Sequence, residues 1–138
     1  MKEQPSSLQI QETRLLAEER GKFMRVAFRQ RRRDGEWQPR KREVYDNGNS
    51  AAIMPYDPTR KTVLLARQLR LPIFLQDGLE RSIEACAGKL EGETPEACII
   101  REMQEELGYR VSKVELLFTL CPSPATVMEK ITLFTCTT

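Results

Sequence analysis

One helix is specified at both ends by the stretch from Thr94 to Gly108, and this stretch limits the possible folds more than any other. Threonine is a good N-cap, Pro95 suits the first helical position, and glycine commonly follows the last turn of a helix. Apolar residues recur inside it at helical spacing and predict the face that packs on a core: Ala97, Ile100, Met103 and Leu107. We therefore expect a helix over residues 95–107.

The same helix carries three closely spaced carboxylates, Glu102, Glu105 and Glu106. Positions three and four apart share a helix face, so these side chains should converge. Like charges so close repel one another, and hard oxygen ligands suit magnesium or manganese. A solvated acidic face is the plain alternative. Glu93 is near enough across the loop-to-helix bend to pair with Arg101, and the loop before it contains glycine, which lets the backbone approach a ligand.

Strand patterns surround this helix. Alternation over 23–28, the Asp34-Gly35 turn and a returning stretch over 37–45 predict a small antiparallel sheet. The segment 8–19 fits either a strand or a helix. Such a sheet is too small to be stable alone, so we expect it to pack on the rest of the chain, on a partner subunit, or on both. Further strands are expected over 50–56, 62–69, 83–87, 114–120 and 130–136.

Strands before and after one strong helix indicate a mixed α+β fold. We expect two parts, a β subdomain over residues 1–46 and a main domain over residues 47–138. No final helix is visible in the sequence to cover the second face of the main sheet. We therefore expect the chain to be a fragment or an unusually short relative, with a C-terminal helix missing.

Composition excludes several classes of protein. The chain has no histidine and its four cysteines form no CxxC pair, which leaves no zinc site and no Ser-His or Cys-His nucleophile pair. We read the cysteines as reduced, small and mostly buried. The N-terminus lacks the apolar segment of a signal peptide, and no run is long enough to cross a membrane. We therefore expect a cytoplasmic protein with no membrane partner.

Positive charge is concentrated in one short region, although the net charge is only +2. Seven basic residues lie within fourteen positions: Arg29, Arg31, Arg32, Arg33, Arg40, Lys41 and Arg42. A solvated hairpin and a surface for a phosphate-bearing ligand are equally open interpretations. Aromatic residues are sparse there, so nucleic acid is not an expected partner.

The helix and the loop before it resemble the Nudix box of the nucleoside-diphosphate-X hydrolases. The match is Glu93, then seven residues, then Arg101-Glu102-Met103-Gln104-Glu105-Glu106-Leu107-Gly108-Tyr109 without a gap. Gly88 lies five positions before Glu93, one fewer than in the general pattern. The resemblance implies a Nudix fold, in which a mixed sheet carries the loop and helix.

Other stretches resemble the GDP-mannose pyrophosphatase branch of this family, which is close to the ADP-ribose pyrophosphatases. They are residues 41–49, 67–70 and 83–88. The resemblance implies hydrolysis of the pyrophosphate bond of a nucleoside diphosphate sugar, with GDP-mannose preferred, to a nucleoside monophosphate and a sugar phosphate. It also implies a homodimer that exchanges its N-terminal sheets.

The resemblance also implies roles for individual residues. Arg101, Glu105 and Glu106 would be catalytic, and Arg42, Arg70 and Glu129 would bind substrate. Mg²⁺, with Mn²⁺ as a second possibility, would be held by Glu102, Glu105, Glu106 and the Ala87 carbonyl. Gly88, Glu93 and Glu84 would support the loop.

Two alternatives remain at this stage. ADP-ribose competes with GDP-mannose as substrate, because no base-reading residue can be identified from the sequence. A different class of function is a non-catalytic or truncated Nudix module that only binds a nucleotide. The intact Nudix box favours an enzyme, whereas the absence of a C-terminal helix and of the acidic loop that often supplies the catalytic base favours the module.

Overall fold

The structure is a computed structural model that describes residues 6–137, and it separates into two units. The first unit runs up to Gly48 and includes Ser123–Glu129, and the second comprises Asn49–Pro122 and the chain from Lys130 onward. The predicted boundary at residues 46 and 47 lies two residues from this division. The return of the short segment 123–129 to the first unit was not anticipated.

The first unit is a four-stranded sheet in the order β1-β2-β3-β11. Its strands are β1 (Leu8–Glu18), β2 (Lys22–Arg31), β3 (Trp37–Asp46) and β11 (Val127–Met128). The first three pair antiparallel, and β11 pairs parallel to the end of β3. The predicted hairpin is confirmed, and the ambiguous segment 8–19 is a strand. Every residue of β1 is exposed, so this edge strand pairs with β2 but buries no side chain within its own unit.

The second unit is built on a mixed four-stranded sheet in the order β10-β12-β4-β9. These strands are β4 (Ser50–Ile53), β9 (Cys86–Lys89), β10 (Glu115–Leu120) and β12 (Ile131–Thr135). The pair β12 and β4 is parallel, and the outer pairs are antiparallel. Two small ladders complete it: β5 (Tyr56–Asp57) with β6 (Thr62–Val63), and β7 (Ala66–Gln68) with β8 (Ser82–Glu84). The expected strands over 50–56 and 62–69 are therefore each broken in two.

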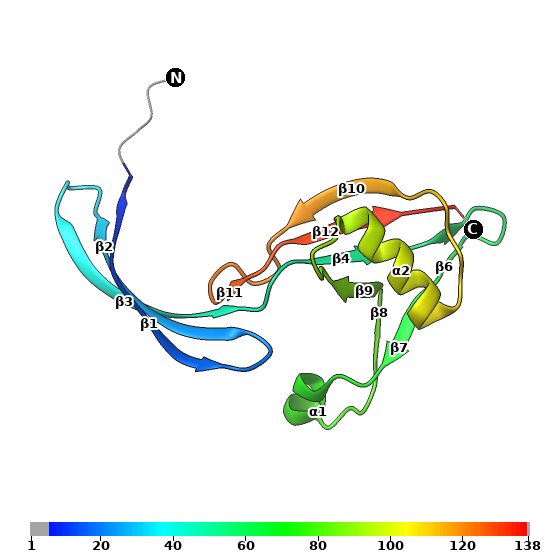
Figure 1. Ribbon diagram of the computed structural model, residues 1–138, viewed down its shortest axis with the longest axis horizontal. Coiled ribbons are helices and arrows are strands. Elements are labelled where there is room, and N and C mark those ends of the chain that lie inside the picture. The colour runs from blue at the N-terminus through cyan, green and yellow to red at the C-terminus, as the bar shows by residue number, and fades with distance from the viewer. Residues whose placement is uncertain (1–5, 138) are drawn as a thin grey trace, which may run out of the picture. The chain divides into compact units, whose positions relative to one another are not determined.

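Helix α2 (Pro95–Leu107) has the predicted limits. The Thr94 hydroxyl accepts a hydrogen bond from the Ala97 amide, and Gly108 ends the helix in the left-handed conformation. Figure 1 shows α2 lying along β4 and β9, with which it is in contact. The face that packs there differs from the predicted one, because Cys98, Ile99 and Met103 are buried whereas Ala97 is exposed. The prediction for Ala97 was wrong because cysteine was not counted as an apolar residue, so Cys98 was left out of the predicted face.

A second helix, α1 (Leu71–Asp77), was not predicted. Pro72 lies in its first turn, and its C-cap Gly78 adopts φ 71°, which a residue without a Cβ tolerates easily. The Gly78 amide donates to the Phe74 carbonyl at 2.8 Å. The helix buries none of its residues, so it has no buried apolar face. Proline and glycine six positions apart were the only usable signals.

The hydrophobic core belongs to the second unit. It lies between α2 and the sheet and consists of eight buried residues: Ala51, Ile53, Cys86, Cys98, Ile99, Met103, Phe134 and Cys136. Three of these are cysteines, and all four cysteines of the chain are free, as expected from the sequence. Among residues 6–137 there is no helix whose length and apolar character would let it cross a bilayer.

Because Met103 is fully buried against the sheet, we expect Met103→Ala to lower the free energy of unfolding by about 2–5 kcal/mol. The matched control is Met54→Ala, since the Met54 side chain is 45% exposed and its loss should cost less than about 1 kcal/mol. Urea denaturation followed by circular dichroism measures both. Equal losses would contradict the assignment of α2 to the core.

Candidate active site

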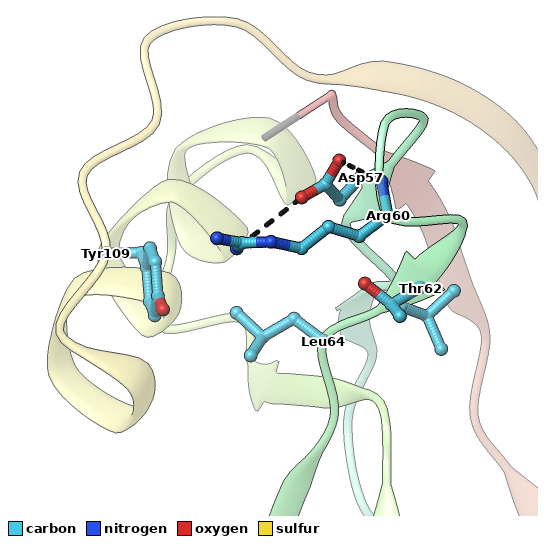
Figure 2. A pocket seen from close by; sticks show the side chains of 6 residues that line it. Asp57, Arg60, Thr62, Leu64 and Tyr109 are labelled. Carbon is cyan, nitrogen blue, oxygen red and sulfur yellow. Dashed lines mark hydrogen bonds and ion pairs between the residues drawn. The ribbon is translucent and has the colours of Figure 1, made fainter.

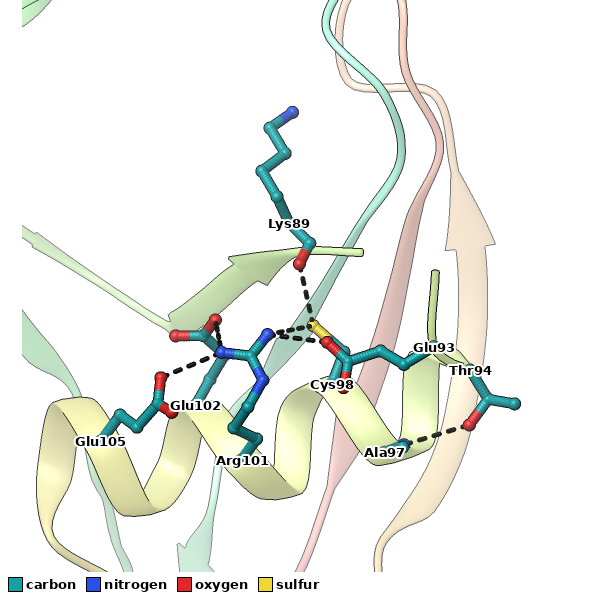
Figure 3. A network of polar contacts seen from close by, with 8 residues as sticks. All are labelled: Lys89, Glu93, Thr94, Ala97, Cys98, Arg101, Glu102 and Glu105. Atoms are coloured by element: carbon teal, nitrogen blue, oxygen red, sulfur yellow. Dashed lines mark hydrogen bonds and ion pairs between the residues drawn. The ribbon is translucent and has the colours of Figure 1, made fainter. Parts of the chain in front are cut away.

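The site is built around Arg101, which projects from the middle of α2 toward the loop that precedes the helix (Figure 3). One of its terminal nitrogens contacts Glu93 at 2.7 Å. The other lies 2.8 Å from Glu102 and 2.9 Å from Glu105. The predicted pairing of Glu93 with Arg101 is therefore confirmed. A single guanidinium is shared by three carboxylates, which ties the loop to the helix and leaves the cluster with surplus negative charge.

The electrostatics of this cluster follow from its hydrogen bonds. The Arg101 guanidinium donates to Glu93 and thereby holds the pKa of that carboxyl below its ordinary value of 4.5. The same hydrogen bond, with those to Glu102 and Glu105, raises the pKa of Arg101. Both shifts favour the charged forms of Glu93 and Arg101 at neutral pH.

Strand β9 lies directly under the acidic side of the helix. A Cβ added to Gly88 would overlap the Glu102 carboxylate, so only glycine leaves room for that side chain. Two residues earlier, the buried Cys86 thiol makes a hydrogen bond with Glu106. Two strand residues and four helix residues both span about 6 Å, so alternate β9 residues meet successive turns of α2. This register sets the positions along β9 of Glu102 and Glu106, two of the predicted metal ligands.

Two cysteines that the sequence marked only as core residues also contact this site. Burial, reinforced by Glu106, raises the pKa of the Cys86 thiol to about 12, so it remains a neutral donor. Burial likewise raises the pKa of Cys98 to about 11. The Cys98 thiol donates to the Lys89 carbonyl at 3.4 Å, and its sulfur lies 3.8 Å from Arg101. The helical spacing of Cys98 and Arg101, three residues apart, could have revealed the first contact, whereas no sequence signal marks that of Cys86.

The three glutamates do not converge as simply as the sequence suggested. Glu102 and Glu105 share one nitrogen of Arg101, whereas Glu106 faces Cys86. Across the part of the chain that the structure describes, no three acidic, histidine or cysteine side chains are close enough to form a ligand set. The donors nevertheless fit a hard divalent cation, since they are carboxylates and one backbone carbonyl, and one arginine neutralises only part of the negative charge. The proposed ligands Ala87, Glu102, Glu105 and Glu106 therefore stay a prediction.

The remaining predicted residues are placed in two groups. Arg70, at the N-cap of α1, contacts Glu84 at 2.7 Å, so the predicted substrate residue and loop support form one ion pair in the second unit. Arg42 and Glu129 belong to the first unit. Arg42 is exposed, and its side chain donates to the Lys41 carbonyl at 2.9 Å, while Glu129 is half-buried beside β11.

A separate hollow of about 280 Å³ lies beside the β5–β6 turn (Figure 2). Its lining includes Asp57, Arg60, Leu64 and Tyr109. Arg60 is held 3.7 Å from Asp57, which also accepts the Arg60 amide at 3.0 Å. None of the residues predicted from the sequence to act in catalysis or to bind metal or substrate lines this hollow.

Comparison with known proteins agrees with this arrangement. Residues 46–132 match the NUDIX domain, and residues 7–45 match the GDP-mannose pyrophosphatase NudK N-terminal domain. Because the first match covers more than half of the chain, the protein belongs to the Nudix hydrolase family, as the sequence predicted.

Particular relatives can also be named. The chain is 40% identical over 131 residues to the GDP-mannose pyrophosphatase of Cronobacter sakazakii, a match that covers 93% of this chain and 68% of that protein. It is 49% identical over 106 residues to the GDP-mannose pyrophosphatase of Salmonella paratyphi B. That match covers 75% of this chain but only 54% of the relative, so the matched region is about half of that enzyme.

The fold is also found in a solved structure. The crystal structure of an ADP compounds hydrolase superposes with a TM-score of 0.72 at 17% identity, covering 99% of this chain and 70% of that one. This likeness confirms the predicted Nudix fold and, at that identity, shows the fold alone.

Ionised Glu93 should stabilise the fold. Because its pKa is lowered on folding, its contribution is fully present above the unfolded-state pKa and is lost as pH falls through the folded-state pKa. We expect Glu93→Gln to lower the melting temperature at pH 7, with the difference from wild type shrinking as pH falls below 4.5 and vanishing once the folded-state carboxyl is protonated. The control Glu80→Gln removes an exposed carboxylate and should show little difference at any pH. A Glu93→Gln difference that persists in acid would contradict the role of its charge.

Proposed function

We propose that this protein hydrolyses the pyrophosphate bond of a nucleoside diphosphate sugar, with GDP-mannose as the preferred substrate. Products are a nucleoside monophosphate and a sugar phosphate. The observation that carries the proposal is the Glu93–Arg101–Glu102–Glu105 network on a Nudix loop and helix. The names of the relatives, which match over both units, support the choice of GDP-mannose.

The chemistry requires the charge of the pyrophosphate to be offset before water attacks phosphorus. Mg²⁺, or Mn²⁺ in its place, held by Glu102, Glu105, Glu106 and the Ala87 carbonyl, would supply that charge and activate water when bound. Arg101 orients two of these carboxylates, and Glu93 keeps the loop against the helix. The Cys86 thiol on β9 lies beside the third carboxylate, that of Glu106.

Positive side chains complete the proposed site. Arg42 and Arg70 would bind the diphosphate and sugar, and Glu129 would accept hydrogen bonds from the substrate. Arg70 is already oriented by Glu84, so its guanidinium keeps donors available on its other edge. We propose a cytoplasmic location, as the sequence predicted.

The direct test is incubation with GDP-mannose and Mg²⁺, with GMP release followed by chromatography. We expect turnover, and we expect Glu106→Gln to reduce it by more than about a hundredfold, because even outer-shell partners of a metal contribute 10- to 100-fold. The control Glu96→Gln changes an exposed carboxylate in the first turn of the same helix and should leave turnover intact. Retained nucleotide binding without GMP release would contradict the enzyme and favour a binding module.

We also propose a homodimer in which the N-terminal sheets are exchanged. In the described chain, the buried hydrophobic residues all belong to the second unit, and the first unit leaves Leu8, Ile10 and Leu15 of β1 at least 46% exposed. A sheet without a core is marginal in water, and a second copy would cover it. In that arrangement Arg42 would act in the partner's site.

Subunit mixing tests this exchange. We expect Arg42→Ala and Glu106→Gln to be nearly inactive separately. When the two are co-expressed, heterodimers should regain one intact site, restoring up to about a quarter of wild-type turnover. Light scattering should give twice the 16.0 kDa mass of the chain. A monomeric mass, or a mixture no more active than its components, would contradict the proposal.

A further inference from the structure

The turn between β2 and β3 forms a hollow that the proposed hydrolysis does not use. It has a volume of about 480 Å³, within the range of small-molecule sites. Its lining lies entirely in the first unit: Gln30, Arg31, Arg32, Arg33, Asp34, Gln38 and Arg40. Four arginines therefore face a single carboxylate.

That carboxylate is already occupied. Asp34 lies 3.2 Å from Arg32 through one oxygen and accepts the Glu36 amide at 3.1 Å through the other. The turn is closed further by the Arg32 amide, which donates to the Glu36 carbonyl at 2.8 Å. Asp34 thus stabilises the turn, and both of its carboxylate oxygens are engaged there. It does not pair with Arg31, Arg33 or Arg40.

The side chains of Arg31, Arg33 and Arg40 have no ion-pair partner among residues 6–137. Arg40 is also partly buried: its Nε is shielded from solvent and has no hydrogen-bond partner among the described residues. A buried donor left unpaired is unfavourable, so Arg40 would gain if its side chain turned to donate to a ligand in the hollow. This orphan donor distinguishes the hollow from an ordinary solvated basic hairpin.

The ladder register places amide groups beside the arginines. Gln30 pairs with Gln38, and the neighbouring Phe28 pairs with Arg40. Residues directly opposite one another share a sheet face, as do residues two apart, so Gln30, Gln38 and Arg40 line one face. Guanidinium and amide donors together suit phosphate oxygens, which guanidinium groups bind in bidentate fashion.

We propose that this hollow is an anion site for a small molecule bearing a diphosphate group, formed by residues other than those of the Nudix loop and helix. A phosphomonoester carries at most about two negative charges, fewer than the three unpaired guanidinium groups, whereas a diphosphate matches them more closely. The volume leaves room for an organic group attached to it.

Calorimetric titration with inorganic pyrophosphate in EDTA tests the site, because without divalent metal the acidic Nudix cluster repels the probe. We expect one saturable site per chain. Arg33→Gln and Arg40→Gln should each weaken binding about tenfold, the effect of losing one charged hydrogen bond. The matched control is Arg14→Gln, which removes the same charge from an exposed position on β1 outside the hollow and should change binding by less than about twofold.

A titration of the wild-type protein followed by amide NMR locates the probe without relying on any variant. We expect pyrophosphate to shift amides within residues 30–40 and to leave those of α2 unchanged. Glu106→Gln should bind pyrophosphate as the wild type does, so failure of the hydrolase proposal leaves this result intact. Absence of saturable binding, equal weakening by Arg14→Gln, or shifts confined to α2 would each overturn the proposal.

Discussion

The functional part of this structure depends on the ion pairs that the Arg101 guanidinium makes with three carboxylates. The guanidinium pairs with all three of Glu93, Glu102 and Glu105, and it lies 2.9 Å or less from each of them. Without it, three carboxylates would repel one another across the loop-to-helix bend. The Arg101 guanidinium binds the loop to the helix, and the excess negative charge lies on one side of α2.

Helix α2 contributes both to the hydrophobic core and to the candidate site, and the residues for each lie on different faces. Ile99 and Met103 are buried and build the core, whereas the carboxylates lie on the side that meets β9. Strand β9 serves both tasks, since Cys86 is a core residue that also bonds Glu106, and Gly88 makes space for Glu102. Stability and the proposed chemistry are therefore coupled through a few contacts, and changes in the core below the helix should disturb the site.

Much of this could be predicted because the information was local. Caps at Thr94 and Gly108 fix the helix limits, and the spacing of Glu93 and Arg101 predicts their ion pair. The missing pieces depended on tertiary context. Helix α1 has no buried face to produce a periodic signal, and β11 is a two-residue strand defined only by its partner β3. The interaction of Glu106 with the Cys86 thiol joins the helix to a neighbouring strand, which no motif records.

Hydrogen–deuterium exchange of Arg101→Ala against wild type tests most directly whether one guanidinium holds the loop to the helix. We expect much faster exchange of amides within residues 91–94, while the amides of α2 after its first turn stay protected by the core. It would be contradicted if the loop amides exchanged at the wild-type rate, because the loop would then be held by contacts other than those of Arg101.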